Sequence, residues 1–326
     1  MKLLPLILVS ACIFGSNLGV VSAATADDAA LAPPKKKFAV KRAQKNEAPD
    51  DTAVVSALPG KKFVYKQSGG KPQELEVYFP PDWDAAKSKG PGVILFHGGT
   101  WRAGDLDQFR YACHYLASRG LVAATANYRM LTKQQRESQP ATESYKRVCI
   151  TDAKSAIRWM KEHAAELGID PQRLIAGGGS AGGHVVLLAT LNPGLNDPGD
   201  NLKTDTRVAA YLLFNPALRP DKAPDAEVEI LQQVKADLPP AIFFFGNQDH
   251  GWKPSADELL QKLKTLGNTN AEMWVAAGQG HGFFNRSPWQ DVALAQADRF
   301  LVAHKFLTGT TTLTPPVSGE KLVQSP

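Results

Sequence analysis

Cysteine is scarce in this chain of 326 residues, which contains three. Small secreted domains that cannot bury a sufficient core depend on several disulfides, and three cysteines cannot supply such a framework. Cys113 and Cys149 are not spaced as metal ligands are, so no metal site is predicted. We expect each to be a small buried residue near a helix, with a disulfide between them as the alternative.

Long apolar runs and a strong charge excess are also lacking over most of the chain. After residue 23, no stretch is long and apolar enough to span a bilayer. The formal charge is +5 and the pI is about 9.0. Residues 24–62 hold eight Lys or Arg against five Asp or Glu, and Lys2 adds one, so about +1 falls in residues 63–326. This balance argues against nucleic acid as a partner.

Residues 1–23 have the features of an export signal. Lys2 precedes an apolar run that ends in Val-Ser-Ala, so we expect a secretory signal peptide cleaved after Ala23 and a secreted or periplasmic protein. Two alternatives stay open. Segment 9–12, Val-Ser-Ala-Cys, resembles a lipoprotein box that would place a lipid on Cys12, and the signal could also remain as an uncleaved anchor.

The rest of the chain divides by composition. Residues 24–62 combine prolines with charged and small residues, which predicts a disordered basic linker. Residues 63–307 are expected to form one folded domain, and residues 308–326, rich in threonine and proline, a loose C-terminal tail.

Apolar runs typical of strands alternate with amphipathic segments across the domain. Strands are expected at residues 75–79, 93–96, 121–127, 174–177, 208–214, 241–245 and 272–275, and helices at residues 106–118, 152–167, 185–189, 255–266 and 292–306. This alternation predicts an α/β fold with a mostly parallel central sheet covered by helices on both faces. In such sheets, functional groups gather beyond the carboxyl ends of the strands.

A glycine-rich turn lies between the expected strand at 174–177 and the following helix. Gly178, Ser180 and Gly182 satisfy the G-x-S-x-G pattern, in which a strained strand-to-helix elbow exposes a serine hydroxyl. The two glycines are expected to remove Cβ atoms that would collide as strand and helix approach. The pattern also occurs in ordinary turns, whereas a phosphate-binding loop is disfavoured because no Gly-Lys-Ser or Gly-Lys-Thr follows.

Several motifs around this elbow resemble those of one family. They are Phe-His-Gly-Gly-Thr-Trp-Arg-Ala-Gly-Asp at 96–105, Asn-Tyr-Arg at 127–129, Asp152 with Ile-Arg-Trp at 157–159, Gly-Ile-Asp-Pro at 168–171, and residues 178–184. Over residues 60–306 the chain is similar to α/β-hydrolases, and among them to the hormone-sensitive-lipase and bacterial carboxylesterase or feruloyl-esterase-like group. The resemblance implies that residues 63–307 are an α/β-hydrolase catalytic domain.

A serine hydroxyl needs a base to take its proton, and that base is oriented by a carboxylate. In this fold the three residues follow in the order serine, acid, histidine. Asp249 and His281 each follow an expected strand, where the family places its acid and base. We therefore expect Ser180 as nucleophile, His281 as general base and acid, and Asp249 as the carboxylate that orients the imidazole.

The tetrahedral intermediate requires backbone N–H donors, and the resemblance implies that Ala181, Gly99 and Thr100 supply them. The chain departs from the family's His-Gly-Gly-Gly loop at Thr100, so the identity of the loop donor stays open. His97 and His184 are expected to brace loops rather than react.

Trp101, Tyr128 and Phe283 are candidate walls of a substrate pocket, with ordinary core packing as the alternative. Segments 131–144 and 216–237 do not resemble a large apolar lid, which favours short acyl groups or soluble esters.

These patterns together favour an exported serine carboxylesterase. It would hydrolyse short-chain or aromatic acyl esters of small molecules or carbohydrates, polysaccharides included, through an acyl-enzyme. Two alternatives remain: an exopeptidase of the prolyl-oligopeptidase-related type, and a catalytically inactive hydrolase fold that serves as a binding module. The predicted chemistry requires no metal or organic cofactor.

Overall fold

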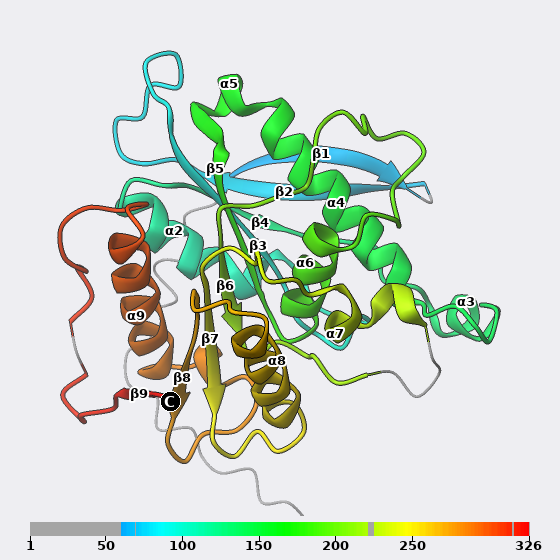
Figure 1. Ribbon diagram of the computed structural model, residues 1–326. Coiled ribbons are helices and arrows are strands. Elements are labelled where there is room, and N and C mark those ends of the chain that lie inside the picture. The colour runs from blue at the N-terminus through cyan, green and yellow to red at the C-terminus, as the bar shows by residue number, and fades with distance from the viewer. Residues whose placement is uncertain (1–59, 69, 221–224, 315, 326) are drawn as a thin grey trace, which may run out of the picture. The chain divides into compact units, whose positions relative to one another are not determined.

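A computed structural model describes residues 60–326 except 69, 221–224, 315 and 326. The predicted signal peptide and almost all of the predicted linker therefore lie outside the described residues. Within the described part of the chain, nine strands form one sheet in the order β1-β2-β4-β3-β5-β6-β7-β8-β9 (Figure 1). Their bounds are Lys61–Ser68, Lys71–Tyr78, Gly90–Phe96, Val122–Ala126, Ile169–Gly179, Ala210–Phe214, Ala241–Gly246, Ala271–Ala276 and Leu322–Gln324 for β1 to β9.

The centre of the sheet is parallel, as the sequence predicts. Strands β4, β3, β5, β6, β7 and β8 run in parallel, whereas β1, β2 and β9 join in antiparallel fashion at the two edges. The central strands carry apolar runs: every side chain from residue 93 to residue 96 in β3 is inaccessible to solvent. Strands buried on both faces need such continuous apolar runs, which is why β3 and β7 were readable from sequence.

Helices cover the two faces of the sheet. Two core clusters form, one including α4, α6 and α8 and the other including α2 and α9 (Figure 1). The helices are α2 Arg110–Ser118, α3 Lys133–Glu137, α4 Lys146–Glu162, α5 Ala164–Leu167, α6 Ala181–Leu191, α7 Ile230–Gln233, α8 Lys253–Thr265 and α9 Trp289–Ala303, with short 3₁₀ turns η1 Leu106–Phe109, η2 Ala226–Val228 and η3 Phe283–Asn285. This arrangement confirms the predicted fold class. Among the described residues, no helix is both long and apolar enough to cross a bilayer.

The C-terminal segment differs from the prediction of a loose tail. Strand β9 pairs antiparallel with β8 and extends the sheet. Before it, the hydroxyls of Tyr115 and Thr311 lie 2.8 Å apart, and Arg119 donates to the carbonyl of Thr308 at 3.0 Å. These contacts attach the segment to the end of α2. They could not be predicted from the sequence, because the segment contains few apolar residues and its contacts are polar.

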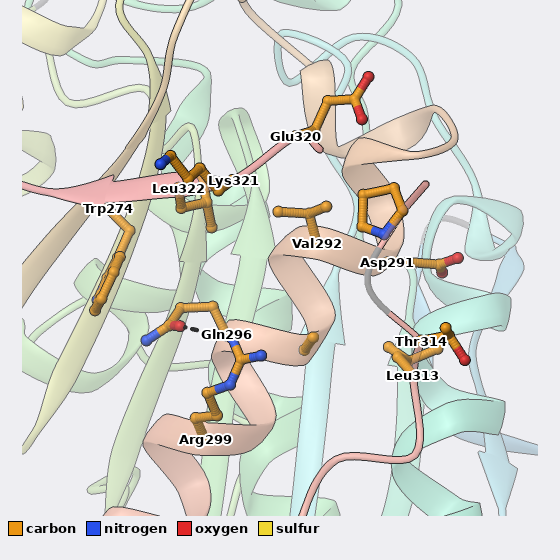
Figure 2. A pocket seen from close by; sticks show the side chains of 12 residues that line it. Trp274, Asp291, Val292, Gln296, Arg299, Leu313, Thr314, Glu320, Lys321 and Leu322 are labelled. Carbon is orange, nitrogen blue, oxygen red and sulfur yellow. Dashed lines mark hydrogen bonds between the residues drawn. The ribbon is translucent and has the colours of Figure 1, made fainter. Parts of the chain in front are cut away.

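A pocket of about 250 Å³ lies between α9 and this C-terminal segment (Figure 2). Figure 2 shows Trp274 of β8 across from Gln296 and Arg299, with Val292 above them. None of its lining residues is a predicted site residue.

The two cysteines of the domain are buried and free, as expected. Cys113 lies in α2 and Cys149 in α4. Burial raises the pKa of the Cys113 thiol well above its usual value.

Candidate active site

Ser180 lies at the turn between β5 and α6, which has the geometry of a strained elbow. Its backbone angles are φ 50° and ψ −114°, and a positive φ costs free energy for a residue with a Cβ atom. Two hydrogen bonds hold it there. The N–H of Ser180 donates to the carbonyl of Phe214, and the N–H of Ala217 donates to the carbonyl of Ser180, both at 2.9 Å.

The elbow closes because its glycines carry no side chain. A Cβ atom on Gly182 would lie 2.0 Å from the carbonyl oxygen of Phe96, and one on Gly178 would lie 2.6 Å from the same oxygen. Real Cβ contacts do not reach such distances. The expectation that these glycines permit close approach of strand and helix is confirmed.

The structure brings the three candidate catalytic side chains together from distant parts of the chain. The His281 Nε2 atom lies 2.8 Å from Ser180 Oγ, and His281 Nδ1 lies 2.7 Å from Asp249 Oδ2. Because an ionised carboxylate only accepts hydrogen bonds, Nδ1 carries the proton and Nε2 accepts from the serine hydroxyl. The Asp249 side chain is buried, Ser180 is half-buried, and the His281 side chain is 35% exposed. A substrate can therefore reach the hydroxyl.

Asn215, which the sequence analysis did not single out, also contacts this group. It directly follows β6, is fully buried, and donates from Nδ2 to Asp249 Oδ2 at 2.9 Å. Its φ of 45° is one that asparagine tolerates better than most residues. The one signal in the sequence was a polar residue immediately after an apolar strand.

The loop after β3 presents backbone N–H groups near the elbow. The N–H of Gly98 is engaged, because it donates to Gln108 Oε1 at 2.5 Å. Gly99 has a φ of 104°, and a Cβ there would meet the carbonyl oxygen of Ala103 at 2.1 Å. Thr100 follows with a φ of 56°, and its exposed side chain donates from Oγ1 to the carbonyl of Gly99 at 2.7 Å.

Ala181 is the first residue of α6, where an N–H has no partner within the helix. It stays, with the N–H groups of Gly99 and Thr100, a predicted donor for a developing oxyanion.

Two buried histidines brace this loop region. His97 stacks on Tyr128 with ring centroids 4.4 Å apart, and its Nδ1 lies 2.8 Å from the carbonyl oxygen of Gly98. His184 Nε2 lies 3.0 Å from the carbonyl oxygen of Val228. Burial lowers the pKa of both imidazoles, that of His184 well below its usual value, so both are neutral near pH 7. This agrees with the expected bracing role.

The expected aromatic pocket wall is largely wrong. Tyr128 and Phe283 are buried to 1% and 0% exposure, and the Tyr128 hydroxyl donates to the carbonyl of His97. Both side chains are core. Trp101 is buried as well, but its ring lies 6.3 Å from that of Trp252. Trp252 is partly exposed.

The ring of Trp252 lies 6.2 Å from the His281 imidazole, so the partly exposed aromatic residue beside the triad is Trp252, which was not predicted from the sequence.

The part of the chain that the structure describes contains no cluster of three His, Cys, Asp or Glu placed to hold a metal.

The fold and the site together define the α/β-hydrolase class. A serine lies on a strand-to-helix elbow of a mostly parallel sheet, and it is hydrogen-bonded to a histidine that is in turn hydrogen-bonded to an aspartate.

Comparisons with known proteins agree with this class. The family described as BD-FAE matches residues 75–212. Apo Thermogutta terrifontis esterase 2 superposes with a TM-score of 0.69 at 33% identity, covering 77% of this chain and 97% of that one. The chain belongs to the family of bacterial α/β-hydrolase esterases.

Two curated relatives come from Mycobacterium tuberculosis. Probable carboxylic ester hydrolase LipM is 30% identical over 212 residues, which is 55% of this chain and 46% of that protein. Carboxylesterase NlhH is 34% identical over 113 residues, 34% of this chain and 31% of that protein. The matches thus span less than half the length of these relatives.

Proposed function

We propose that this protein is an exported serine esterase that hydrolyses short-chain or aromatic acyl esters through an acyl-enzyme. The observation that carries the proposal is the continuous hydrogen-bonded chain from Ser180 through His281 to Asp249, with distances of 2.8 and 2.7 Å. Nucleophile and base lie within hydrogen-bond reach, and a third group orients the base.

The chemistry follows from these contacts. Ser180 Oγ attacks the ester carbonyl carbon while its proton passes to His281 Nε2, and Asp249 stabilises the imidazolium that forms. N–H groups of Ala181 and of the loop at Gly99 and Thr100 stabilise the oxyanion, each contributing roughly 3 kcal/mol to lowering the barrier. His281 then gives its proton to the departing alcohol. A water molecule, deprotonated by His281, hydrolyses the acyl-enzyme and restores the serine.

The relatives support ester substrates with short acyl groups. Structures of Thermogutta terrifontis esterase 2 include propionate-bound and butyrate-bound forms. The polar and charged composition of segments 131–144 and 216–237 does not resemble that of a large apolar lid, which favours the same size range. Esters carried by polysaccharides are included in the proposal because the predicted export signal would place the enzyme outside the cell.

A panel of 4-nitrophenyl acetate, butyrate and octanoate, with methyl ferulate added, tests this function by kcat/KM. We expect the shorter chains or the feruloyl ester to exceed octanoate, and Ser180→Ala to abolish all of them. Hydrolysis of aminoacyl amides in preference to every ester would instead support the exopeptidase alternative. Binding without turnover, unchanged in Ser180→Ala, would support the inactive binding module.

Export is tested separately by the N-terminus of the mature protein produced in a bacterial host. The proposal predicts a mature chain that begins at Ala24. An acylated Cys12 would show lipoprotein anchoring, and an intact Met1 would contradict cleavage altogether.

A further inference from the structure

Two arginines close to the triad have no carboxylate partner among the described residues. Among the described residues, six arginines form ion pairs with Asp or Glu: Arg110, Arg119, Arg129, Arg147, Arg158 and Arg207. Arg102 and Arg219 are exposed, and within that same part of the chain neither pairs with a carboxylate.

Arg219 is held beside the triad by an aromatic ring. Its guanidinium carbon lies 5.0 Å from the centroid of the Trp252 ring, and that ring lies 6.2 Å from the His281 imidazole. A guanidinium stacked on a ring keeps its N–H groups free at the edges of its plane. The Trp252 ring therefore lies between the Arg219 guanidinium and the imidazole of His281, the predicted base.

Arg102 lies in the loop that carries the expected oxyanion donors Gly99 and Thr100. The backbone N–H of Arg102 donates to the carbonyl of Gly99 at 3.0 Å, so Arg102 belongs to the same turn as Gly99 and Thr100. Its guanidinium carbon lies 5.3 Å from the Tyr145 ring centroid, and Nη2 donates to the Tyr145 hydroxyl at 3.2 Å.

The carboxylates of the neighbouring elements are already engaged. Asp249 accepts from His281, Asp225 pairs with Arg147 at 2.8 Å, and Asp257 pairs with Lys253 at 2.7 Å. They do not neutralise the two arginines. Both guanidinium groups therefore keep N–H groups that these carboxylates do not engage.

We propose that Arg219, assisted by Arg102, recognises a carboxylate on the alcohol part of the ester. This rests on the proposed function. His281 gives its proton to the departing alcohol, so the alcohol lies on the imidazole side of the site, which is where Trp252 and Arg219 stand. The substrate class is thus an acyl ester of an acidic alcohol, such as a hydroxy acid or an acidic sugar.

The test compares 4-acetoxybenzoate, whose alcohol part carries a carboxylate, with its neutral methyl ester. For each enzyme the measured quantity is the ratio of kcat/KM for the anionic ester to that for the neutral ester. We expect Arg219→Met to lower this ratio about tenfold, mainly through KM for the anionic ester, and Arg102→Met to lower it less. Arg219→Lys should restore part of the ratio. The wild-type preference should weaken with added salt.

Arg173 provides the matched control. Its guanidinium carbon lies 5.9 Å from the Phe306 ring, a similar stacked arrangement, but it stands in β5 six residues before the strand ends at Gly179. Arg173→Met should leave the ratio unchanged.

Three outcomes overturn the inference while the proposed function stands: an unchanged ratio in Arg219→Met, an equal fall in the Arg173→Met control, or a fall carried by kcat alone. A wild-type enzyme that hydrolyses neither ester would instead contradict the proposed function itself.

Discussion

The Asp249 carboxylate is held by two donors that meet at one oxygen. Oδ2 accepts from His281 Nδ1 at 2.7 Å and from Asn215 Nδ2 at 2.9 Å, and both Asp249 and Asn215 are buried. Rotation about the Cβ–Cγ bond of Asp249 would move Oδ2 out of line with the imidazole, and a second hydrogen bond to this oxygen opposes that rotation. Asn215 supplies that contact from the end of the neighbouring strand, so we assign it a positioning role.

Asn215→Ala should lower kcat about tenfold, the effect of losing one hydrogen bond to a charged group, and leave KM nearly unchanged. The measurement is steady-state kinetics on 4-nitrophenyl acetate. Asn268→Ala is the control, because Asn268 is another buried amide that donates to backbone carbonyls, those of Ala236 and Leu238. It should lower thermal stability without changing kcat. A tenfold rise in KM in Asn215→Ala would place Asn215 in substrate binding instead.

The single residues that could be predicted from the sequence are Ser180, Asp249 and His281, because each is a reactive type in a stretch that contains few others. A serine between glycines, and an aspartate and a histidine after apolar strands, are few enough to be ranked. Asn215 was missed because Asn-Pro after a strand reads as a simple turn, and Trp252 because an aromatic residue at a helix start reads as core. Their roles depend on neighbours more than 25 positions away in the chain.

The elbow is the element that presents the nucleophile, and it depends on backbone atoms that touch. Helix α6 begins at Ala181, two residues after β5 ends at Gly179, and it packs against both β5 and β3. The carbonyl oxygen of Phe96 occupies the space that a side chain on Gly182 would need.

Gly182→Ala should destabilise the fold by about 3 kcal/mol, because the added Cβ forces β3 and α6 apart. Urea unfolding measures this, and the matched control is Gly280→Ala. Gly280 precedes His281, and a Cβ there would meet nothing within 4 Å. Equal unfolding midpoints for the two variants would contradict the close contact at the elbow.

Elements were predictable where burial and apolarity coincide. Strands β3, β6 and β7 are apolar runs, whereas β1 contains three lysines among its eight residues and pairs at an edge, so it was missed. Helix α4 begins at Lys146, six residues before the predicted start. Its buried Lys154 donates to the carbonyl of Asn192 and its Arg158 pairs with Asp200, contacts that a sequence reading assigns to solvent.

Across the whole molecule, ion pairs join segments distant in sequence, and they set its response to acid. Burial acts to raise the pKa of the Asp205 carboxyl, but hydrogen bonds from Arg207 and Lys161 outweigh it and lower that pKa to about 2. Asp225 has a lowered pKa for a similar reason, through Arg147. Each such carboxylate favours the folded state as long as it remains ionised.

The contribution of these carboxylates to the free energy of unfolding should therefore be constant above about pH 5 and fall as the pH decreases from about 4 to 2. It adds to an earlier fall below about pH 7, where the unfolded chain protonates His97 and His184 while the folded protein keeps them neutral. The pKa of Asp205 in the folded protein, about 2, lies below its ordinary value of 3.8. Its ionised carboxylate therefore stabilises the fold fully above about pH 4, and this stabilisation is lost as the pH falls toward 2. Urea unfolding at a series of pH values measures it. Asp205→Asn should flatten the fall, whereas a steeper fall in this variant would contradict the assignment.

The claim on which the mechanism depends is that His281 makes the Ser180 hydroxyl the single reactive nucleophile of the protein. Labelling by a fluorophosphonate probe, followed by peptide mass spectrometry, measures this most directly. We expect one adduct, located on Ser180, that is absent in Ser180→Ala and forms at least about 10³-fold more slowly in His281→Ala. An adduct on another residue, or labelling of His281→Ala at the wild-type rate, would contradict the account.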